Sequence, residues 1–302
     1  MYDMIVVGAG PAGLTAAVYA LRANKTVLVL EKASFGGQIT HSPKIENFPG
    51  TVRISGTELA DRMVEHAISQ GADLELGEVT EVSRDEEGFT VTTEDGSYRG
   101  KTVVAAVGVR HRTLPLTCAD EALWESVSYC AVCDGAFYKD KEVVVVGGGN
   151  SALQEALMLS ELCKKVTVVQ NLPYLTGEAR LIELVNANPT ITVITGTVAT
   201  GLLGNGTLER VAVKEEATGK EDSIPADGLF IAVGLVPDND RYASLAELNE
   251  WGYFASGEDC LTRTPGFYIA GDCRSKQIRQ ITTAVSDGAT AALAACRYLE
   301  QR

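Results

Sequence analysis

The chain has 302 residues, with 26 Lys or Arg against 40 Asp or Glu, so its formal net charge is −14. This length is typical of about two domains, and a composition of 45% hydrophobic and 22% charged residues is that of an ordinary globular protein. Nucleic acid and acidic membrane surfaces are excluded as partners, because both attract basic proteins. No apolar run approaches the roughly 20 residues of a membrane span, and no signal peptide precedes the first strand pattern, so we expect a cytoplasmic protein.

The chain begins with the order strand, glycine turn, helix, strand and acid, which opens a dinucleotide-binding unit. A β-branched run at 4–7 leads into Gly8-Ala9-Gly10-Pro11-Ala12-Gly13, followed by an alanine-rich helical pattern and a second apolar run at 26–30. Gly8 suits a tight turn, Gly10 the close approach of a diphosphate, and Gly13 helix–strand packing. Glu31 at the end of the second strand favours an unphosphorylated ribose, as in FAD or NAD. The alternative is a purely structural glycine turn.

The same pattern returns about 140 residues later. Short β patterns at 72–104, separated by turns, predict an antiparallel excursion, and then a valine run at 143–146 leads into Gly147-Gly148-Gly149 and a second helix. This unit closes near 229–234. The tail is a strand at 267–270, a polar loop and an alanine-rich helix over 289–299. The sequence therefore predicts an α/β protein with two Rossmann-like nucleotide-binding domains.

Two of the seven cysteines, Cys130 and Cys133, are spaced as a Cys-x-x-Cys pair. In a cytosolic protein such a pair indicates a redox dithiol, zinc binding or two inert cysteines. Zinc is disfavoured because no second ligand pair of similar spacing exists, and we expect no metal. Asp134 next to the pair is placed to deliver a proton to a leaving thiolate, although it also suits a turn. We expect the other five cysteines to be inert.

These motifs together resemble the low-molecular-weight thioredoxin reductases of the bacterial type. The segments that carry the resemblance span the whole chain in order: Gly8–Gly13, Gly36-Gly37-Gln38, Glu46–Gly50, Ser128–Gly135, Gly147–Ala152, and Gly271-Asp272 with Arg279-Gln280. The resemblance implies a discontinuous FAD-binding domain over 1–113 and 242–302. A NAD(P)H-type domain over 114–241, which carries the dithiol, would be inserted into it.

The resemblance also implies roles for single residues. The FAD-binding positions would be Gly8, Gly10, Pro11, Ala12, Gly13, Glu31, Gly37, Gln38, Asn47, Gly271, Asp272, Arg279 and Gln280. In this family the residue at Cys133 faces the flavin, the one at Cys130 attacks the disulfide of thioredoxin, and the one at Asp134 is the acid–base residue. Members are typically homodimers. Taken singly, the flavin-side positions outside the first glycine motif also suit ordinary loops.

One segment departs from the family pattern. Members that use NADPH carry a His-Arg-Arg stretch after the second strand of this unit and a further Arg four positions on, which meet the ribose 2′-phosphate. The corresponding positions here are Gln170, Asn171, Leu172 and Thr176. Losing two or three such contacts, at about 1.5–3 kcal/mol each, weakens NADPH binding by orders of magnitude. NADPH is therefore doubtful, unless Lys164, Lys165 or Arg180 holds a nicotinamide cofactor in another way.

The departure resembles the ferredoxin-dependent flavin thioredoxin reductases, which keep FAD and the dithiol. Ferredoxins are acidic, so docking on a chain of charge −14 requires a local basic patch. Candidates are Arg110-His111-Arg112 and Arg274-Ser275-Lys276 with Arg279, which also suit solvated surface charges. The rival functions are an NADPH-dependent thioredoxin reductase, an FAD-dependent dithiol oxidase that uses oxygen, and a non-catalytic FAD-bound redox sensor.

Overall fold

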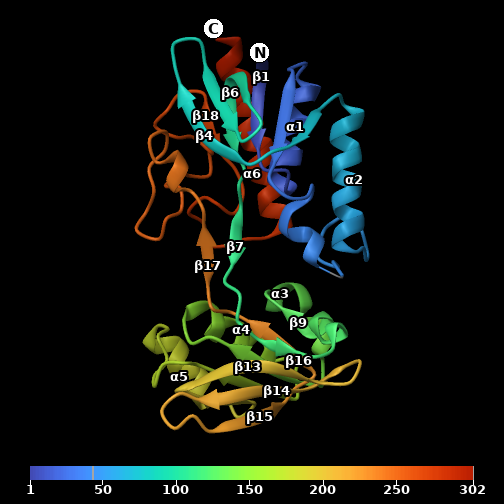
Figure 1. Cartoon of the computed structure of the whole chain (residues 1–302), viewed down its shortest axis with the longest axis vertical. Helices are drawn as coiled ribbons and strands as arrows, with labels where there is room; N and C mark the ends of the chain where they lie inside the picture. Colours follow the sequence, from blue (N-terminus) through green and yellow to red (C-terminus); the bar gives the residue numbers. More distant parts are fainter. Residues whose placement is uncertain (43, 302) are drawn as a thin grey trace. The chain divides into compact units, whose positions relative to one another are not determined.

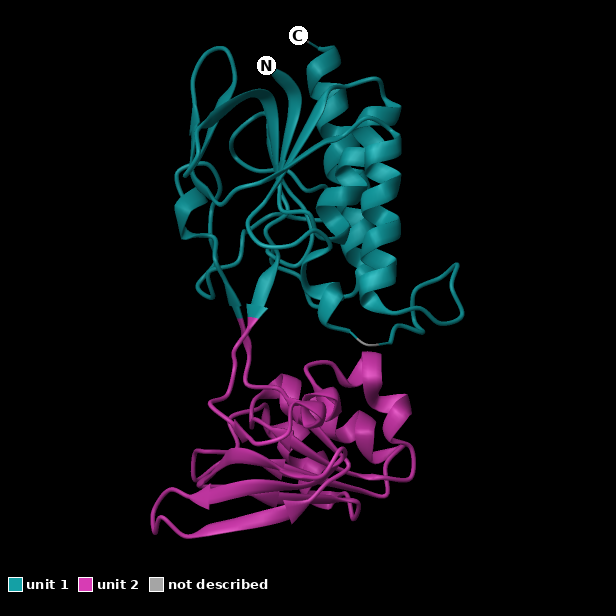
Figure 2. Cartoon of the chain, turned by 45° about the vertical axis from the view of Figure 1, so that its right-hand side comes forward, with its two compact units in different colours: residues 1–110, 236–302 teal, residues 111–235 magenta. Residues whose placement is uncertain are grey.

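The chain forms two compact α/β units (Figure 1), which confirms the predicted fold class. The structure is a computed structural model and describes residues 1–42 and 44–301. Unit 1 comprises Met1–Arg110 and Val236–Arg302, and unit 2 is the continuous segment His111–Leu235 (Figure 2). The boundaries expected from the sequence, at 113/114 and 241/242, lie a few residues further along the chain.

Unit 1 is built on a seven-stranded sheet whose central strands are parallel. Its order is β3 (Asp73–Leu76), β2 (Val27–Glu31), β1 (Tyr2–Val7), β6 (Ser97–Ala105), β5 (Phe89–Thr93) and β4 (Val79–Arg84), with β18 (Phe267–Ile269) also paired to β6. Strands β4, β5 and β6 are antiparallel, as the turns at 72–104 predicted. The antiparallel part of the sheet is shorter than expected, however, because β3, the first strand of the segment 72–104, pairs with β2 in parallel.

Three helices cover the sheet of unit 1: α1 (Pro11–Arg22), α2 (Gly56–Ser69) and α6 (Ile281–Glu300). Helices α1 and α6 pack very closely, since a Cβ at Gly288 would lie 2.1 Å from the carbonyl oxygen of Ala12. Small residues on both helices allow this approach. Helix α6 begins at Ile281, before the predicted 289, because Gln280 and Thr283 form a capping box there.

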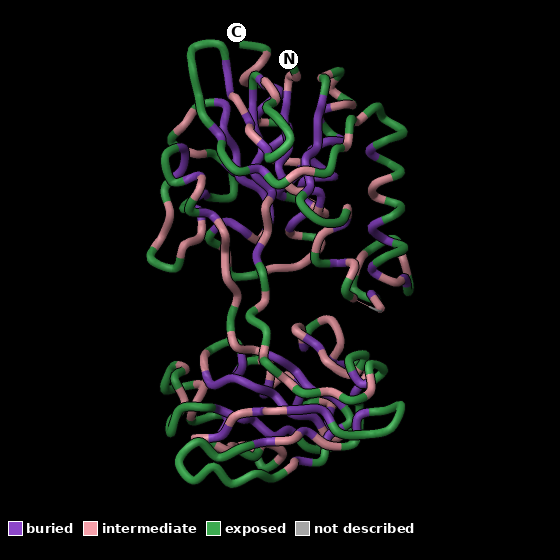
Figure 3. Tube along the Cα trace, in the orientation of Figure 1, coloured by how far each residue is buried: buried purple, intermediate pink, exposed green. Residues whose placement is uncertain are grey.

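Unit 2 repeats the arrangement on a smaller scale. Its parallel sheet has the order β12 (Ile191–Ile194), β11 (Lys165–Val169), β10 (Glu142–Val146), β16 (Gly228–Ile231) and β9 (Val127–Ser128). The interior of β10 is Val143 to Val146, all buried, because both faces of a parallel sheet are covered (Figure 3). Helices α4 (Asn150–Ser160) and α5 (Ala179–Ala187) belong to this layer.

A second sheet and three short helical turns complete unit 2. The sheet has the order β15 (Glu221–Pro225), β14 (Leu208–Glu215), β13 (Thr197–Gly204) and β8 (Thr117–Cys118). The turns are η2 (Glu121–Ser126), α3 (Ala131–Asp134) and η3 (Gly135–Tyr138). Where the chain passes between the units, β7 (Val109–His111) and β17 (Leu235–Pro237) pair as a two-stranded sheet. Among the described residues, no helix is long and apolar enough to cross a bilayer.

Candidate functional site

The first glycine turn has the geometry that a diphosphate needs. Gly8 has φ of 102°, and a Cβ there would lie 2.4 Å from the carbonyl oxygen of Ala106. A Cβ at Gly13 would lie 1.8 Å from the oxygen of Gly8, so only glycine lets α1 begin against the turn. At Gly10, by contrast, the nearest atom lies 4.0 Å away, which leaves the mouth of the turn open. Pro11 then starts α1 at a position where it costs no hydrogen bond.

The carboxylate of Glu31 is held at the same turn. Its Oε2 accepts a hydrogen bond of 2.8 Å from the N–H of Ala9, and its Oε1 accepts one of 3.0 Å from Ala33. Glu31 is the last residue of β2 and is buried. The strand and the turn therefore fix one carboxylate beside the open glycine, where it can accept from a ribose hydroxyl.

The structure brings the other flavin-side segments to this turn. Gly37, which begins η1 (Gly37–His41) together with Gln38, has φ of 60°, and its Cβ would lie 3.2 Å from the Cα of Gly10. A Cβ at Gly271 would lie 2.9 Å from that of Ala12. These contacts place three stretches that are far apart in the sequence around one site.

The C-terminal loop adds polar groups to the site. The amide of Asn47 donates to Gln280 Oε1 at 3.2 Å, and the guanidinium of Arg279 stacks on Tyr253 at 4.3 Å and donates to the carbonyl of Asp272. The Oδ1 atom of Asp272 is buried, with no hydrogen-bond partner in the described part of the chain, and burial raises the pKa of this carboxyl. An orphaned buried oxygen requires a donor, and a ligand hydroxyl meets that need. The open turn and this oxygen fit FAD.

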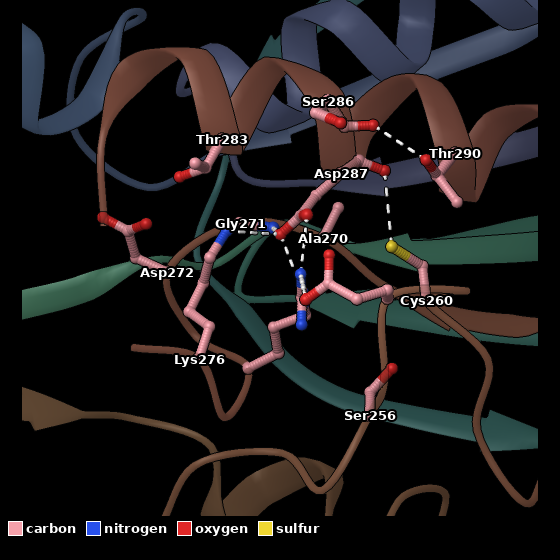
Figure 4. A network of polar contacts seen from close by, with 12 residues as sticks. Ser256, Cys260, Ala270, Gly271, Asp272, Lys276, Thr283, Ser286, Asp287 and Thr290 are labelled. Atoms are coloured by element: carbon pink, nitrogen blue, oxygen red, sulfur yellow. Dashed lines mark hydrogen bonds and ion pairs between the residues drawn. The ribbon is translucent and has the colours of Figure 1, made fainter. Parts of the chain in front are cut away.

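The loop is anchored by a buried carboxylate that the sequence analysis missed. Asp287 of α6 accepts hydrogen bonds from Gly271 N at 3.0 Å, from Arg274 at 2.8 and 2.9 Å, and from Lys276 Nζ at 2.9 Å (Figure 4). Its side chain is only 5% exposed. The signal in the sequence was an Asp on the otherwise apolar face of α6, three residues after Ala284.

The same network overturns one expectation. Arg274 and Lys276 were candidates for a basic docking patch, but Arg274 is 2% exposed and the side chain of Lys276 is 5% exposed. Both cations are paired with Asp287, and Arg274 also pairs with Glu258 at 2.9 Å. The prediction of a surface patch at 274–276 is therefore wrong, because these charges turn inward.

In unit 2, Cys130 and Cys133 are joined in a disulfide with a Cα–Cα distance of 5.3 Å. Cys130 caps α3, and its Sγ accepts from the N–H of Cys133 at 3.2 Å. Of the other cysteines, four are buried and Cys118 is half-buried. No group of three or more His, Cys, Asp or Glu among the described residues could hold a metal ion. The pair thus closes a short turn at the start of α3.

Asp134 lies at the end of this turn in a partly closed environment. The hydroxyl of Ser128 donates to its Oδ2 at 2.6 Å, while its Oδ1 is buried and finds no partner within residues 1–42 and 44–301. Burial raises the pKa of the Asp134 carboxyl, and the Ser128 hydrogen bond opposes this only in part. A carboxyl with a raised pKa beside a disulfide is suited to hold a proton for it.

The second glycine turn keeps the fold of the first, and at Gly149, which corresponds to Gly10, the nearest atom lies 3.8 Å from a Cβ. A Cβ at Gly147 would lie 2.4 Å from the oxygen of Ala232, just as in the first turn. At Gly148, however, a Cβ would lie 2.5 Å from Cδ of Gln170, a side chain that is 5% exposed. Gln170 occupies the strand end where the first unit has Glu31. The side chain at this position contacts the glycine turn in both units, but in unit 2 it is the neutral amide of Gln170 in place of the carboxylate of Glu31.

The C-terminal end of the loop after Gln170 is held by hydrogen bonds, the first of which matches the bond from the N–H of Gly36 to the carbonyl of Ala9 in unit 1. The N–H groups of Thr176 and Gly177 donate to the carbonyl of Gly148 at 2.8 and 3.0 Å. Asn150, the first residue of α4, exchanges two hydrogen bonds with Glu178, at 2.7 and 3.0 Å. These contacts fold the loop onto the glycine turn.

Two of the three cations proposed as substitutes for the lost ones are poorly placed. Lys165 is the first residue of β11 and pairs with Glu142 across the sheet, so it lies at the opposite end of the strands from the glycine turn. Lys164 precedes it and forms an ion pair with Glu142 at 2.9 Å. Arg180 on α5 is exposed and lies 3.4 Å from Glu183. Lys164 and Lys165 therefore do not reach the site where a 2′-phosphate would bind.

Comparisons with known proteins agree over the whole chain. Residues 2–288 match the family model described as pyridine nucleotide-disulphide oxidoreductase. The chain is 38% identical over 302 residues to a thioredoxin reductase of Listeria innocua, covering 100% of this chain and 95% of that protein. It is also 38% identical over 298 residues to a Clostridium pasteurianum protein described as a 34.2 kDa protein in the rubredoxin operon, covering 98% and 97%. The crystal structure of thioredoxin reductase from Streptococcus pyogenes superposes with a TM-score of 0.95 at 38% identity, covering 100% and 99%.

Proposed function

Because the chain belongs to the pyridine nucleotide-disulphide oxidoreductases, and among them to the thioredoxin reductases, we propose that it is a flavin-dependent thioredoxin reductase whose electrons come from ferredoxin. Family membership supports the enzyme class and FAD as its cofactor. The donor is a separate matter, and the observation that carries our proposal is the absence of cationic side chains at Gln170, Asn171, Leu172 and Thr176, beside the second glycine turn. The working form in this proposal is a cytoplasmic homodimer.

FAD, when bound, supplies a carrier that collects single electrons and passes them on in pairs. The residues that would hold it are those of the first glycine turn. Gly8 and Gly13 shape the turn, Gly10 leaves room for the diphosphate, and Glu31 accepts from the ribose. On the flavin side, Asp272 offers its buried unpartnered oxygen, and Gly37, Gln38, Asn47, Arg279 and Gln280 complete the set.

The dithiol turn then passes the electrons to thioredoxin. In this proposal Cys133 receives the electron pair as the disulfide opens, and Cys130 attacks the disulfide of thioredoxin. Asp134 holds a proton at its raised pKa and delivers it to the thiolate that leaves. Ser128 orients this carboxyl through its 2.6 Å hydrogen bond. On this chain, each step transfers a proton or exchanges a disulfide between groups only a few residues apart in the sequence.

Replacement of Asp134 by Asn tests the proton step. We expect the rate of thioredoxin reduction to fall by about 10²-fold or more, since a positioned acid contributes that much. The wild-type rate should decline as the pH rises through the raised pKa of Asp134, because the carboxyl then loses its proton. In D134N this decline should be absent. A variant with the wild-type rate and pH profile would contradict the role, and Asp140→Asn, at an exposed aspartate of the same unit, serves as a control.

Because the chain carries a net negative charge, an acidic electron donor can bind only where basic side chains gather locally. With the charged groups of Arg274 and Lys276 turned inward, a further candidate is β7 and the residue after it, where Arg110 and Arg112 are exposed and Arg110 lies 3.7 Å from Asp238. We propose this segment as the contact for ferredoxin, driven by local charge rather than by the net charge.

The donor is tested by mixing the purified protein anaerobically with NADPH, NADH or reduced ferredoxin and following flavin bleaching. We expect fast bleaching by ferredoxin, weakened by salt, and none by micromolar NADPH within the same time. Rapid bleaching by NADPH would reject the ferredoxin proposal in favour of an ordinary NADPH-dependent reductase. Rapid reoxidation by oxygen with turnover of small dithiols would favour the oxidase. Slow reduction by every donor would favour the sensor.

A further inference from the structure

A second carboxyl lies on α4, the helix that packs against the short helix α3 of the dithiol turn. Glu155 belongs to α4, and α3 packs against this helix, with Ala131 buried in the same cluster as Ala152 and Ala156. One oxygen of Glu155, Oε2, is buried and has no hydrogen-bond partner among the residues described. The carboxylate accepts a hydrogen bond from the backbone N–H of Ala131, the residue directly after Cys130. None of the roles assigned above uses this group.

We propose that Glu155 is a positioning residue of the dithiol, which takes up a proton when the Cys130–Cys133 disulfide is reduced. It acts on Cys130 through the N–H of Ala131, which it holds. The inference rests on the proposed use of this pair as the redox dithiol. It does not depend on the electron donor.

The chemistry of reduction explains the coupling. Two electrons break the sulfur–sulfur bond, and one proton makes Cys133 a thiol while Cys130 is left as a thiolate. This adds a negative charge next to Ala131, whose N–H already faces the Glu155 carboxylate. Two negative charges close together in a buried site repel each other, so Glu155 binds a proton more tightly in the reduced state. That proton comes from solvent, and it leaves again when thioredoxin reoxidises the pair.

The surroundings of Glu155 allow it to change its protonation near neutral pH. Burial raises its pKa to about 7, and the Ala131 N–H is the opposing cause. Other elements packed on α4 carry few charges: Asp134 on α3, the Arg180–Glu183 pair on α5, and Glu142 and Lys165 at the starts of β10 and β11. None of these is among the causes of the shift. At pH 7 the group is therefore close to half-protonated and responds to a nearby charge.

The direction of the effect follows. Below pH 7 Glu155 is neutral in both states and does not oppose reduction. Above pH 7 it is ionised in the oxidised protein, so reduction must either place two charges together or take up a proton. The dithiol is thus harder to reduce at high pH than it would be without this carboxylate.

The test is the equilibrium of the holoprotein with reduced and oxidised dithiothreitol at pH 6.0 and 8.5. The reduced fraction is read by alkylation and mass spectrometry of the peptide that contains Cys130 and Cys133. Relative to wild type at the same pH, E155Q should show an unchanged equilibrium constant at pH 6.0. At pH 8.5 its constant should favour the dithiol about tenfold more, which is about 30 mV for a two-electron couple.

The control is Glu161→Gln, which removes one exposed charge just after α4 and should match wild type at both values of pH. Equal constants for E155Q and wild type at pH 8.5, or an equal shift at both values of pH, would overturn the proposal. If the disulfide of the wild type does not open reversibly at all, the proposed function itself fails, and the two failures are thereby distinguished.

Discussion

Replacement of Cys130 by Ser is expected to abolish thioredoxin reduction, by at least about 10³-fold, while leaving reduction of the flavin by its donor intact. The thiolate is the nucleophile in disulfide exchange, and a serine hydroxyl does not ionise at the pH values at which a thiol does. Stopped-flow absorbance gives the first reaction, and a coupled thioredoxin assay gives the second.

The matched control is Cys118→Ser, which changes a half-buried cysteine in the same unit and should keep the wild-type rates. Cys133→Ser should also block turnover, but it leaves Cys130 as a free thiol that can form a stable mixed disulfide with thioredoxin. If the C130S variant turns over thioredoxin near the wild-type rate, the roles assigned to the two cysteines are wrong. The same holds if the C133S variant forms no mixed disulfide with thioredoxin.

The parts of the fold that could be predicted from the sequence are those with local signals. Gly8, Gly10 and Gly13 at fixed spacing, between a buried strand and an alanine-rich helix, imply a turn whose geometry depends only on near neighbours. The valine run before Gly147 repeats that signal. The discontinuous character of unit 1 came from the family resemblance, since no local pattern says that β18 returns to pair with β6.

What was missed depends on contacts between residues far apart in the chain. Arg274 and Lys276 looked like loop charges in solvent, and only the packing of α6 brings Asp287 to them. Similarly, the sequence at 170–176 revealed lost cations but not that Gln170 would pack on Gly148. In such cases the useful signal is a polar residue on an apolar helix face. Asp287 follows Ala284, and Glu155 follows Ala152, at the spacing of one helical turn.

The ionised carboxylate of Asp287 stabilises the loop that contains Gly271 and Asp272. Burial alone would raise its pKa, but the hydrogen bonds from Arg274 and Lys276 bring the pKa below the usual range. A group with a lowered folded-state pKa contributes stability above its unfolded pKa, about 4 for Asp, and loses it as the pH falls through the folded value. Asp287 is therefore fully stabilising at neutral pH.

Replacement of Asp287 by Asn should consequently cost about 3–5 kcal/mol at neutral pH, because it leaves the buried Lys276 without a counter-ion and leaves Arg274 with only the exposed Glu258. It also frees the loop that carries Asp272, so the FAD dissociation constant should rise by at least about tenfold. Thermal unfolding of the FAD-free protein reports the first effect, and flavin fluorescence on titration reports the second. The difference in stability from wild type should begin to shrink below about pH 4, where Asp287 of the unfolded wild type is protonated, and should shrink further as the pH falls through the lowered pKa of the folded state.

Two further variants separate the buried charge from the loss of a surface contact. Glu258→Gln removes the outer partner of Arg274, a side chain that is 89% exposed, and should cost no more than about 1 kcal/mol. Adding Lys276→Met to D287N removes the cation that has lost its counter-ion, so it should restore part of the lost stability, whereas independent sites would give additive losses. If D287N is as stable as E258Q and binds FAD as tightly, the loop is not anchored by Asp287, and its position must come from the close packing of Gly271 and Gly288 against Ala12.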